Sequence, residues 1–192
     1  MKKARKVDLE EGQVLTKPDF KKLYDHAKNS ALWYVMNGNK TLHQIKEKLY
    51  DKGYPRGVVF WVNDEGVNVE SDIVSEIAAF LVSNLFVDDE DYALRFAQSR
   101  KRNGFGQGRV KSDLFLRGVD EKFIQQAIGE VYGSGDVSEL ERYLSKEYRL
   151  MSRREANTYK LKSKLISKAV SKGWSLDDIY RGIDELFNED LA

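Results

Sequence analysis

The sequence predicts an all-α fold of three tandem three-helix repeat units, with a short β-hairpin inserted near residues 58–69. Three observations support this fold class. Apolar residues recur at helical spacing through most of the 192 residues, and only two prolines, Pro18 and Pro55, interrupt the chain. In addition, one short residue pattern occurs three times, which is typical of a repeat architecture.

The repeated pattern is a base, a glycine and an apolar residue, and it follows a helical stretch each time. It occurs at Lys52–Tyr54, Arg117–Val119 and Lys172–Trp174. A cation in the last turn of a helix with glycine just beyond it indicates a helix C-terminus, because glycine reaches the left-handed conformation without a Cβ clash. The spacing of the three glycines leaves room for three short helices in each unit.

Apolar periodicity and capping residues define the individual helices. Capping boxes are expected at Thr41–Gln44, Ser138–Glu141 and Ser152–Glu155, where side chains can bond the free backbone N–H groups. Asp120 and Ser175 follow two of the repeated glycines and are favourable N-caps. The nine helices are expected at roughly 19–36, 41–52, 71–86, 89–103, 107–117, 120–132, 138–149, 152–172 and 175–187.

Residues 57–70 break the helical pattern. Two runs rich in valine and aromatic residues, 57–62 and 67–70, flank the turn-forming segment Asn63–Gly66. This arrangement predicts a short β-hairpin. The Phe60–Trp61 pair either packs against helices of its own unit or is exposed as a contact site, and both interpretations stay open.

We divide the chain into a basic N-terminal arm and three helical repeats. The arm contains the bases Lys2, Lys3, Arg5 and Lys6. Repeat 1 includes the hairpin insertion, for which we take residues 55–70. The predicted boundaries are 1–18 for the arm, 19–87 for repeat 1, 88–133 for repeat 2 and 137–192 for repeat 3.

Charged residues alternate in blocks along the chain, although the formal net charge is only +1. No base stands between Arg56 and Arg95, where nine acids occur. Seven bases and one acid follow from Arg95 to Arg117, and ten bases against two acids lie from Arg142 to Lys172. An acidic tail completes the chain. The blocks either pair within the chain and keep it soluble, or form one basic face for a polyanion or an acidic partner.

The sequence contains no catalytic constellation. The absence of cysteine excludes disulfides, thiol catalysis and Cys-ligated metal sites. The two histidines, His26 and His43, have no acidic neighbour at metal-ligand spacing. Gly104–Gly108 lacks the lysine and the preceding strand of a phosphate-binding loop, so we interpret it as a tight turn with Phe105 packed beneath it. We therefore expect no enzyme activity, no cofactor and no metal site.

The sequence also predicts no contact with a membrane. No apolar run approaches the ~18 residues that a transmembrane helix needs. The basic N-terminus lacks the apolar stretch of a signal peptide. We therefore expect a cytoplasmic protein.

The central part of the chain carries a motif of three features: a basic helix end, a Gly-aromatic-Gly turn and an Arg-Gly helix end. Its residues are Leu85–Ala93, Ser99–Gly106, Val110, Leu114 and Arg117–Val119. In these features and their spacing the chain resembles the RecX family of bacterial RecA recombinase regulators. A weaker similarity extends over residues 25–187. The chain departs from the family in a stretch between Tyr54 and Asp72 that is longer than the family's usual turn, and in the third unit, which has no Gly-Phe-Gly turn.

The resemblance implies an elongated, curved array of three-helix units that binds the groove of the RecA–DNA filament. It implies a non-catalytic protein of DNA repair, recombination and the SOS response that inhibits recombinase, ATPase and co-protease activities. The implied partners are the RecA filament and single- or double-stranded DNA, and we expect the protein to act as a monomer.

Bases of the second and third units are the predicted contacts to DNA or to the partner, and the alternative for each is a solvated helix face. The predicted binding residues are Arg95, Arg100, Lys101, Arg102, Arg109, Lys111, Arg117, Arg149, Arg153, Arg154, Lys160, Lys164 and Lys168. The predicted structural-turn residues are Gly104, Phe105, Gly106 and Gly118.

Two other functions compete with filament regulation. The first is a helix-turn-helix-like module acting directly on DNA, although the acids at 120–121 and throughout 175–187 would repel phosphate. The second is a purely protein-binding adaptor, for which partner affinity would not depend on salt.

Overall fold

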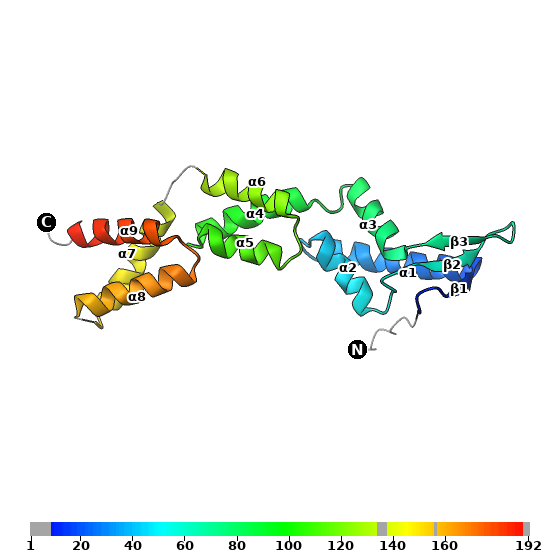
Figure 1. The fold of residues 1–192 in the computed structure, drawn as a ribbon, viewed down its shortest axis with the longest axis horizontal. Helices are drawn as coiled ribbons and strands as arrows, with labels where there is room; N and C mark the ends of the chain where they lie inside the picture. Colours follow the sequence, from blue (N-terminus) through cyan, green and yellow to red (C-terminus); the bar gives the residue numbers. More distant parts are fainter. Residues whose placement is uncertain (1–8, 134–137, 156, 190–192) are drawn as a thin grey trace. The chain divides into compact units, whose positions relative to one another are not determined.

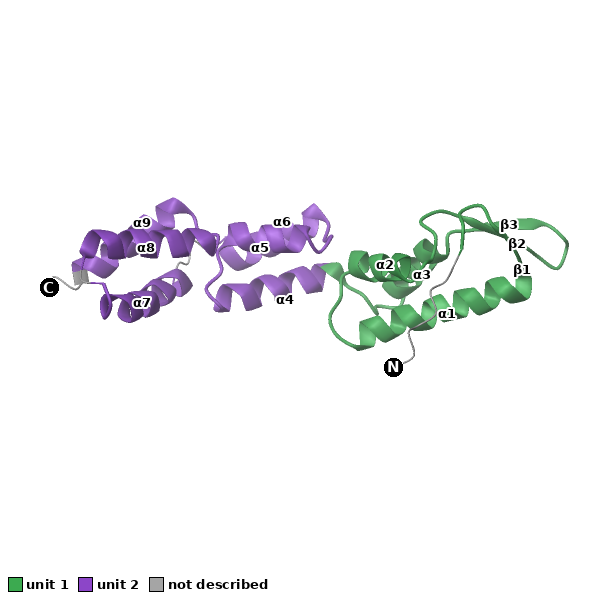
Figure 2. Cartoon of the chain, turned by 90° about the horizontal axis from the view of Figure 1, so that it is seen from below, with its two compact units in different colours: residues 1–89 green, residues 90–192 purple. Residues whose placement is uncertain are grey.

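The computed structural model describes residues 9–133, 138–155 and 157–189. The chain divides into two compact units, residues 1–89 and 90–192 (Figure 2). Within the described ranges there are nine α-helices and three short strands, labelled in Figure 1. None of the described helices is both long and apolar enough to span a bilayer.

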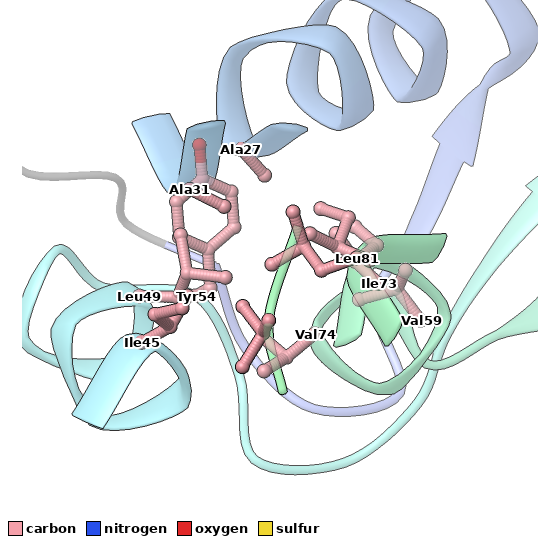
Figure 3. Close-up of a cluster of buried hydrophobic side chains, with 11 residues drawn as sticks. Ala27, Ala31, Ile45, Leu49, Tyr54, Val59, Ile73, Val74 and Leu81 are labelled. Atoms are coloured by element: carbon pink, nitrogen blue, oxygen red, sulfur yellow. The ribbon is translucent and has the colours of Figure 1, made fainter. Parts of the chain in front are cut away.

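The first unit packs three helices around one apolar core. These helices are α1 (Lys17–Met36), α2 (Leu42–Asp51) and α3 (Ile73–Ser83). Ile45 and Leu49 of α2 meet Val74 and Leu81 of α3 in this core (Figure 3). Because α3 is apolar on most of its surface, it is the most buried helix of the unit. Tyr54 is also buried here, and its hydroxyl lies 2.6 Å from His26 Nδ1.

A small sheet extends this core. Strands β2 (Val59–Val62) and β3 (Asn68–Ser71) form the predicted antiparallel hairpin, with Val62 opposite Asn68. A third strand, β1 (Val14–Thr16), pairs in parallel with β2. Trp61 stacks on Phe20 of α1 at a ring distance of 5.0 Å. Of the two interpretations of Phe60–Trp61, packing against the unit's own helices is therefore correct for Trp61.

The second unit contains two three-helix groups, each with its own core. The first is α4 (Asp89–Arg102), α5 (Gln107–Phe115) and α6 (Glu121–Tyr132). Its core joins Ala93 and Ala97 to Val110 and Leu114. The second group packs Leu140, Leu144, Leu165 and Ile179 in its core and consists of α7 (Ser138–Ser152), α8 (Thr158–Ser171) and α9 (Leu176–Glu189). The predicted all-α fold of three-helix units with a β-hairpin is thus confirmed, while their arrangement as a curved array stays a prediction.

The repeated glycines end the second helix of each group as predicted. Gly53, Gly118 and Gly173 have φ values of 95°, 71° and 85°. In each case the amide of the following apolar residue donates to a carbonyl five residues earlier, as from Tyr54 to Leu49 at 3.3 Å. These bonds satisfy carbonyl groups that a helix end would leave free.

Local caps account for most of the helix starts. Thr41 forms the predicted capping box with Gln44, and Asp120 and Ser175 accept backbone hydrogen bonds from Lys122 and Asp178. Ser138 is the first residue of α7.

Several details differ from the sequence predictions. Among the helix ends, the largest difference is the start of α8, which was expected at 152 and lies at Thr158. The capping box at Ser152–Glu155 is wrong, because Ser152 still belongs to α7 and the N-cap of α8 is Asn157. Strand β1 was not predicted, since a three-residue strand carries too little pattern. Helix α1 begins two residues early, at Lys17 with Pro18 in its first turn, where a missing N–H costs nothing. The bases of the predicted arm, Lys2–Lys6, lie outside the described residues.

Leu85 ends α3 in a conformation that glycine occupies at the repeat ends. Its φ is 56°, and it is the one described non-glycine residue with positive φ. The amide of Phe86 donates to the carbonyl of Leu81 at 2.9 Å, so the geometry is the same as after Gly53. The Leu85 side chain is 84% exposed, so packing does not compensate for the strained backbone.

We expect Leu85→Gly to stabilise the first unit by about 0.5–1 kcal/mol, because glycine removes the Cβ strain and loses some of this gain to unfolded-state entropy. Amide hydrogen exchange at Ile77 and Leu81 measures the change. Ala79→Gly, at an exposed position inside α3, is the control and should destabilise the same amides by about 1 kcal/mol. Slower amide exchange in both variants, or in neither, would contradict the prediction.

Candidate nucleic-acid interface

One face of α7 carries a row of bases. Arg142, Lys146 and Arg149 are spaced four and three residues apart, so they lie on the same side of the helix. All three side chains are exposed. The opposite side of α7 is buried through Leu140 and Leu144, and this packing fixes the direction in which the row faces.

Two hollows adjoin this row. The first has a volume of about 210 Å³ and lies between the end of α4, with Arg102 and Asn103, and the α7 side chains Arg142, Tyr143 and Lys146. It therefore combines residues of two three-helix groups.

The second hollow is larger and lies along α7 alone. Its volume is about 500 Å³, and Arg149 and Leu150 line it. Arg142 and Lys146 line both hollows, so the two lie side by side along α7. We call this surface, with Arg102, Arg142, Lys146 and Arg149 as its cations, the basic groove.

The groove carries excess positive charge. Its one lining acid, Glu139, pairs with Arg142 at 3.1 Å. Among the described side chains, no carboxylate forms an ion pair with Arg102, Lys146 or Arg149. Three cations with free donors around one concave surface can bind an anion that carries several charges, such as a polyphosphate backbone.

Several predicted binding residues are instead held inside the second unit. The Arg100 guanidinium lies 4.9 Å from both the Phe96 and Phe105 rings, and Arg117 lies 4.9 Å from the Phe96 ring. Lys101 Nζ donates to the carbonyl of Val131 at 2.9 Å. Cation–π contacts and hydrogen bonds of this kind stabilise the packing of α4 against its neighbours.

Two further predicted residues pair with acids on their own or adjacent helices. Arg95 pairs with Asp91 at 2.8 Å, one turn away on α4. Arg109 pairs with Asp113 at 3.0 Å, and Asp113 also lies 3.6 Å from Arg100. The single acid of this basic block therefore neutralises two of its bases.

The predicted bases of α8 are partly neutralised as well. Lys164 pairs with Glu155 at 2.8 Å, and Lys168 pairs with Glu147 at 2.5 Å. The hydrogen bond from Lys164 lowers the pKa of the Glu155 carboxyl below its usual value, with a second contribution from the backbone amide of Asn157. The Glu155 carboxyl is thus charged at neutral pH, and the two ion pairs reduce the positive potential of α8.

The remaining predicted residues lie outside the groove, and all but the half-buried Lys111 are exposed. Arg153 and Arg154 follow the end of α7, Lys160 lies in the first turn of α8, and Lys111 lies on α5. None of these four lines either hollow. Of the thirteen predicted binding residues, the structure brings only Arg102 and Arg149 together in the groove.

Arg142 and Lys146 are groove residues that the sequence prediction left out. Both belong to the basic block that begins at Arg142. Their spacing of four and three residues up to Arg149 could have identified them, because it places the three bases on one face of a helix. A count of the bases in the block does not contain this information.

The predicted turn residues have a second role beside the groove. Gly104 has a φ of 74° and Phe105 packs on the core of its group, as predicted. A Cβ on Gly104 would lie 3.3 Å from Tyr143, so this glycine lets α7 approach the turn closely. Burial raises the pKa of the Tyr143 hydroxyl, and Glu147 adds to this effect.

Comparison with known proteins identifies relatives of the whole chain. Residues 88–128 match the family model described as RecX, second three-helix domain. The protein named Regulatory protein RecX from Clostridium perfringens (strain SM101 / Type A) is 26% identical over 89% of this chain and 72% of its own length. Its namesake from Clostridium acetobutylicum is 25% identical over 98% of this chain and 80% of its own length.

Solved structures share the fold. The crystal structure of RecX from Lactobacillus salivarius superposes with a TM-score of 0.68 at 21% identity, covering 88% of this chain and 97% of that one. A second crystal structure, of regulatory protein RecX, gives a TM-score of 0.70 at 17% identity, covering 86% of this chain and 75% of that one. At these identities the superpositions establish the arrangement of helices and no particular binding residue.

Proposed function

Because the chain belongs to the RecX family of regulatory proteins, we propose that it binds the RecA–DNA filament and inhibits RecA recombinase, ATPase and co-protease activities. The proposed partners are RecA protomers and DNA, and the protein acts as a non-catalytic monomer in the cytoplasm. The observation that carries the DNA part of this proposal is the basic groove.

The groove suits a phosphodiester backbone for two reasons. Its cations lie in a row along α7 with Arg102 beside them, so several phosphates of one strand can be contacted together. Three of the four cations form no ion pair with a described side chain, so binding a phosphate breaks no existing pair there. In contrast, four of the other predicted bases would first have to leave Asp113, Glu155 or Glu147, namely Arg100, Arg109, Lys164 and Lys168.

Direct reading of a DNA sequence is the weaker alternative. Helix α6 begins with Asp120 and Glu121, and α9 begins with Asp177 and Asp178, so both helix starts carry acids. A recognition helix needs uncharged polar or basic groups at this end to reach base edges between phosphates. We expect selection from random DNA duplexes to enrich no sequence.

The central experiment measures RecA ATP hydrolysis and strand exchange on single-stranded DNA, with and without this protein. We expect both activities to fall at stoichiometric amounts. Unchanged hydrolysis and unchanged strand exchange would refute the proposed regulation.

A single substitution measures how many phosphates the groove contacts. Lys146→Ala should make the slope of log affinity against log salt for single-stranded DNA shallower by about 0.7, because one cation–phosphate contact is lost. Lys122→Ala is the control, since Lys122 lies on α6 over the Phe123 ring and lines neither hollow. Equal slopes for the two variants would contradict the assignment of Lys146 to the interface.

A further inference from the structure

Two turns of the second unit fit against each other beside the basic groove. The segment Gly104–Gly108 contains the turn between α4 and α5 and the first two residues of α5, and the turn Lys172–Trp174 joins α8 to α9. The Gly106 amide donates to the Lys172 carbonyl at 2.9 Å, and the Gly108 amide donates to the Gly173 carbonyl at 3.1 Å. We call this contact between the two three-helix groups the glycine junction.

Side chains complete the junction on both sides. The Trp174 indole donates from Nε1 to the Gly104 carbonyl at 3.0 Å, and its ring meets Tyr132 edge to face. Lys172 Nζ lies 3.8 Å from the centre of the Phe105 ring. Trp174 belongs to the core of the third repeat, so the junction links that core directly to a turn of the second repeat.

The backbones approach so closely that side chains are excluded. A Cβ on Gly106 would overlap the Gly173 carbonyl, and a Cβ on Gly173 would overlap the Arg109 backbone amide. Gly173 also requires glycine for its φ of 85°. The neighbouring atoms are backbone and cannot rotate away, so any larger residue at Gly106 must separate the two turns.

The groove depends on this contact because its two sides come from different three-helix groups. Arg102 and Asn103 end α4, immediately before the Gly104–Gly108 turn, whereas Arg142 and Lys146 belong to α7. The smaller hollow exists only where the α4 end faces α7. Each group has its own apolar core, so each can keep its helices when the contact between them loosens.

We propose that the glycine junction positions Arg102 against the cation row of α7, so that Gly106, Gly173 and Trp174 are positioning residues of a composite phosphate-binding groove. This inference rests on the proposed function, since it assumes that the groove binds a DNA strand. It adds that neither three-helix group alone forms the complete site.

The test combines a distance measurement with a binding measurement on the full chain. The protein contains no cysteine, so Gln125→Cys on α6 and Ser163→Cys on α8 introduce two specific spin labels at exposed positions. Gly106→Ala is the test variant. Gly129→Ala on α6 is the matched control, because a Cβ there meets no atom within 4 Å. Circular dichroism establishes that each variant keeps its helices.

We expect a narrow distribution of label distances in the parent and in Gly129→Ala, and a broad distribution in Gly106→Ala. Affinity for a single-stranded oligonucleotide should fall about tenfold in Gly106→Ala, to the level of Arg102→Ala, because the separated groups bind the strand without the Arg102 contact. In addition, Arg102→Ala should weaken binding in the parent but add nothing in the Gly106→Ala background, a non-additivity that simple loss of stability does not produce.

Trp174→Phe provides a second test if Gly106→Ala does not fold, since it keeps an aromatic ring in the core and loses the bond to Gly104. A narrow distance in a folded Gly106→Ala would overturn the role of the junction. A broad distance with unchanged DNA affinity, or with additive effects of Arg102→Ala, would overturn positioning while leaving the proposed function intact. If the parent binds no DNA, the proposed function loses its DNA part and the composite phosphate site is refuted with it.

Discussion

Replacing Trp174 with alanine should destabilise the second unit by about 4 kcal/mol, the largest stability effect that we expect for a single substitution in this chain. The side chain is only 7% exposed and packs on the core of the third repeat. Its removal leaves a cavity and also leaves the Gly104 carbonyl without the indole donor. The loss therefore has a packing component and a hydrogen-bond component.

Trp174→Phe separates these components. It keeps most of the buried area, so its loss in free energy of unfolding should be smaller than that of Trp174→Ala by about 2 kcal/mol. Amide hydrogen exchange at Leu165, Ala169 and Ile179 reports the free energy of opening. Tyr159→Ala in α8 is the control, since Tyr159 is 82% exposed in the same unit and its removal should cost less than about 1 kcal/mol. A loss below about 1.5 kcal/mol for Trp174→Ala would show that the contact between the turns contributes little.

Reversing the three cations of α7 should abolish binding to single-stranded DNA at physiological salt. The triple variant Arg142→Glu, Lys146→Glu, Arg149→Glu replaces attraction to phosphate by repulsion along the whole groove. We expect at least a hundredfold loss of affinity at low salt, or about 3 kcal/mol. Fluorescence anisotropy with a labelled oligonucleotide measures the affinity, and RecA ATP hydrolysis measures whether regulation is lost with it.

The control carries the same change of net charge elsewhere. Lys21→Glu, Lys40→Glu, Lys122→Glu alters three exposed lysines that line neither hollow. It should reduce affinity only through the weaker long-range field, which salt screens. Similar losses for the two triple variants would mean that net charge, and not the groove, determines binding. Loss of DNA binding with RecA inhibition retained would assign the regulation to protein contacts.

Most helix boundaries were predictable because short-range interactions determine them. Thr41, Asp120 and Ser175 cap the helices that follow them, and the repeated glycines adopt positive φ because no other residue does so at low cost. The exceptions have local reasons too. Ser152 has a capping pattern, but α7 continues through it because Asn157 is available as the N-cap of α8.

The candidate site was only partly predictable because pairing of charges depends on distant packing. Lys168 and Glu147 lie on different helices, and their ion pair exists only because α7 packs against α8. The Arg100 and Arg117 guanidinium groups both contact the Phe96 ring, although Arg100 precedes α5 in the sequence and Arg117 follows it. A count of bases along the chain cannot separate such residues from Lys146, for which the described side chains provide no ion pair.

The sequence by itself determined that the chain is helical, where the helices approximately end, the hairpin and the resemblance to the RecX family. These features depend on patterns within a few residues or on motifs at fixed spacing. Only the tertiary structure decided which bases remain available for a ligand and that Arg102 faces Arg142 and Lys146 across two three-helix groups. The physical reason is that bases are neutralised by acids of neighbouring helices, and hollows form between helices that pack together. At Gly106 and Gly173 two turns approach so closely that their backbones are in contact, and no local sequence pattern predicts this contact.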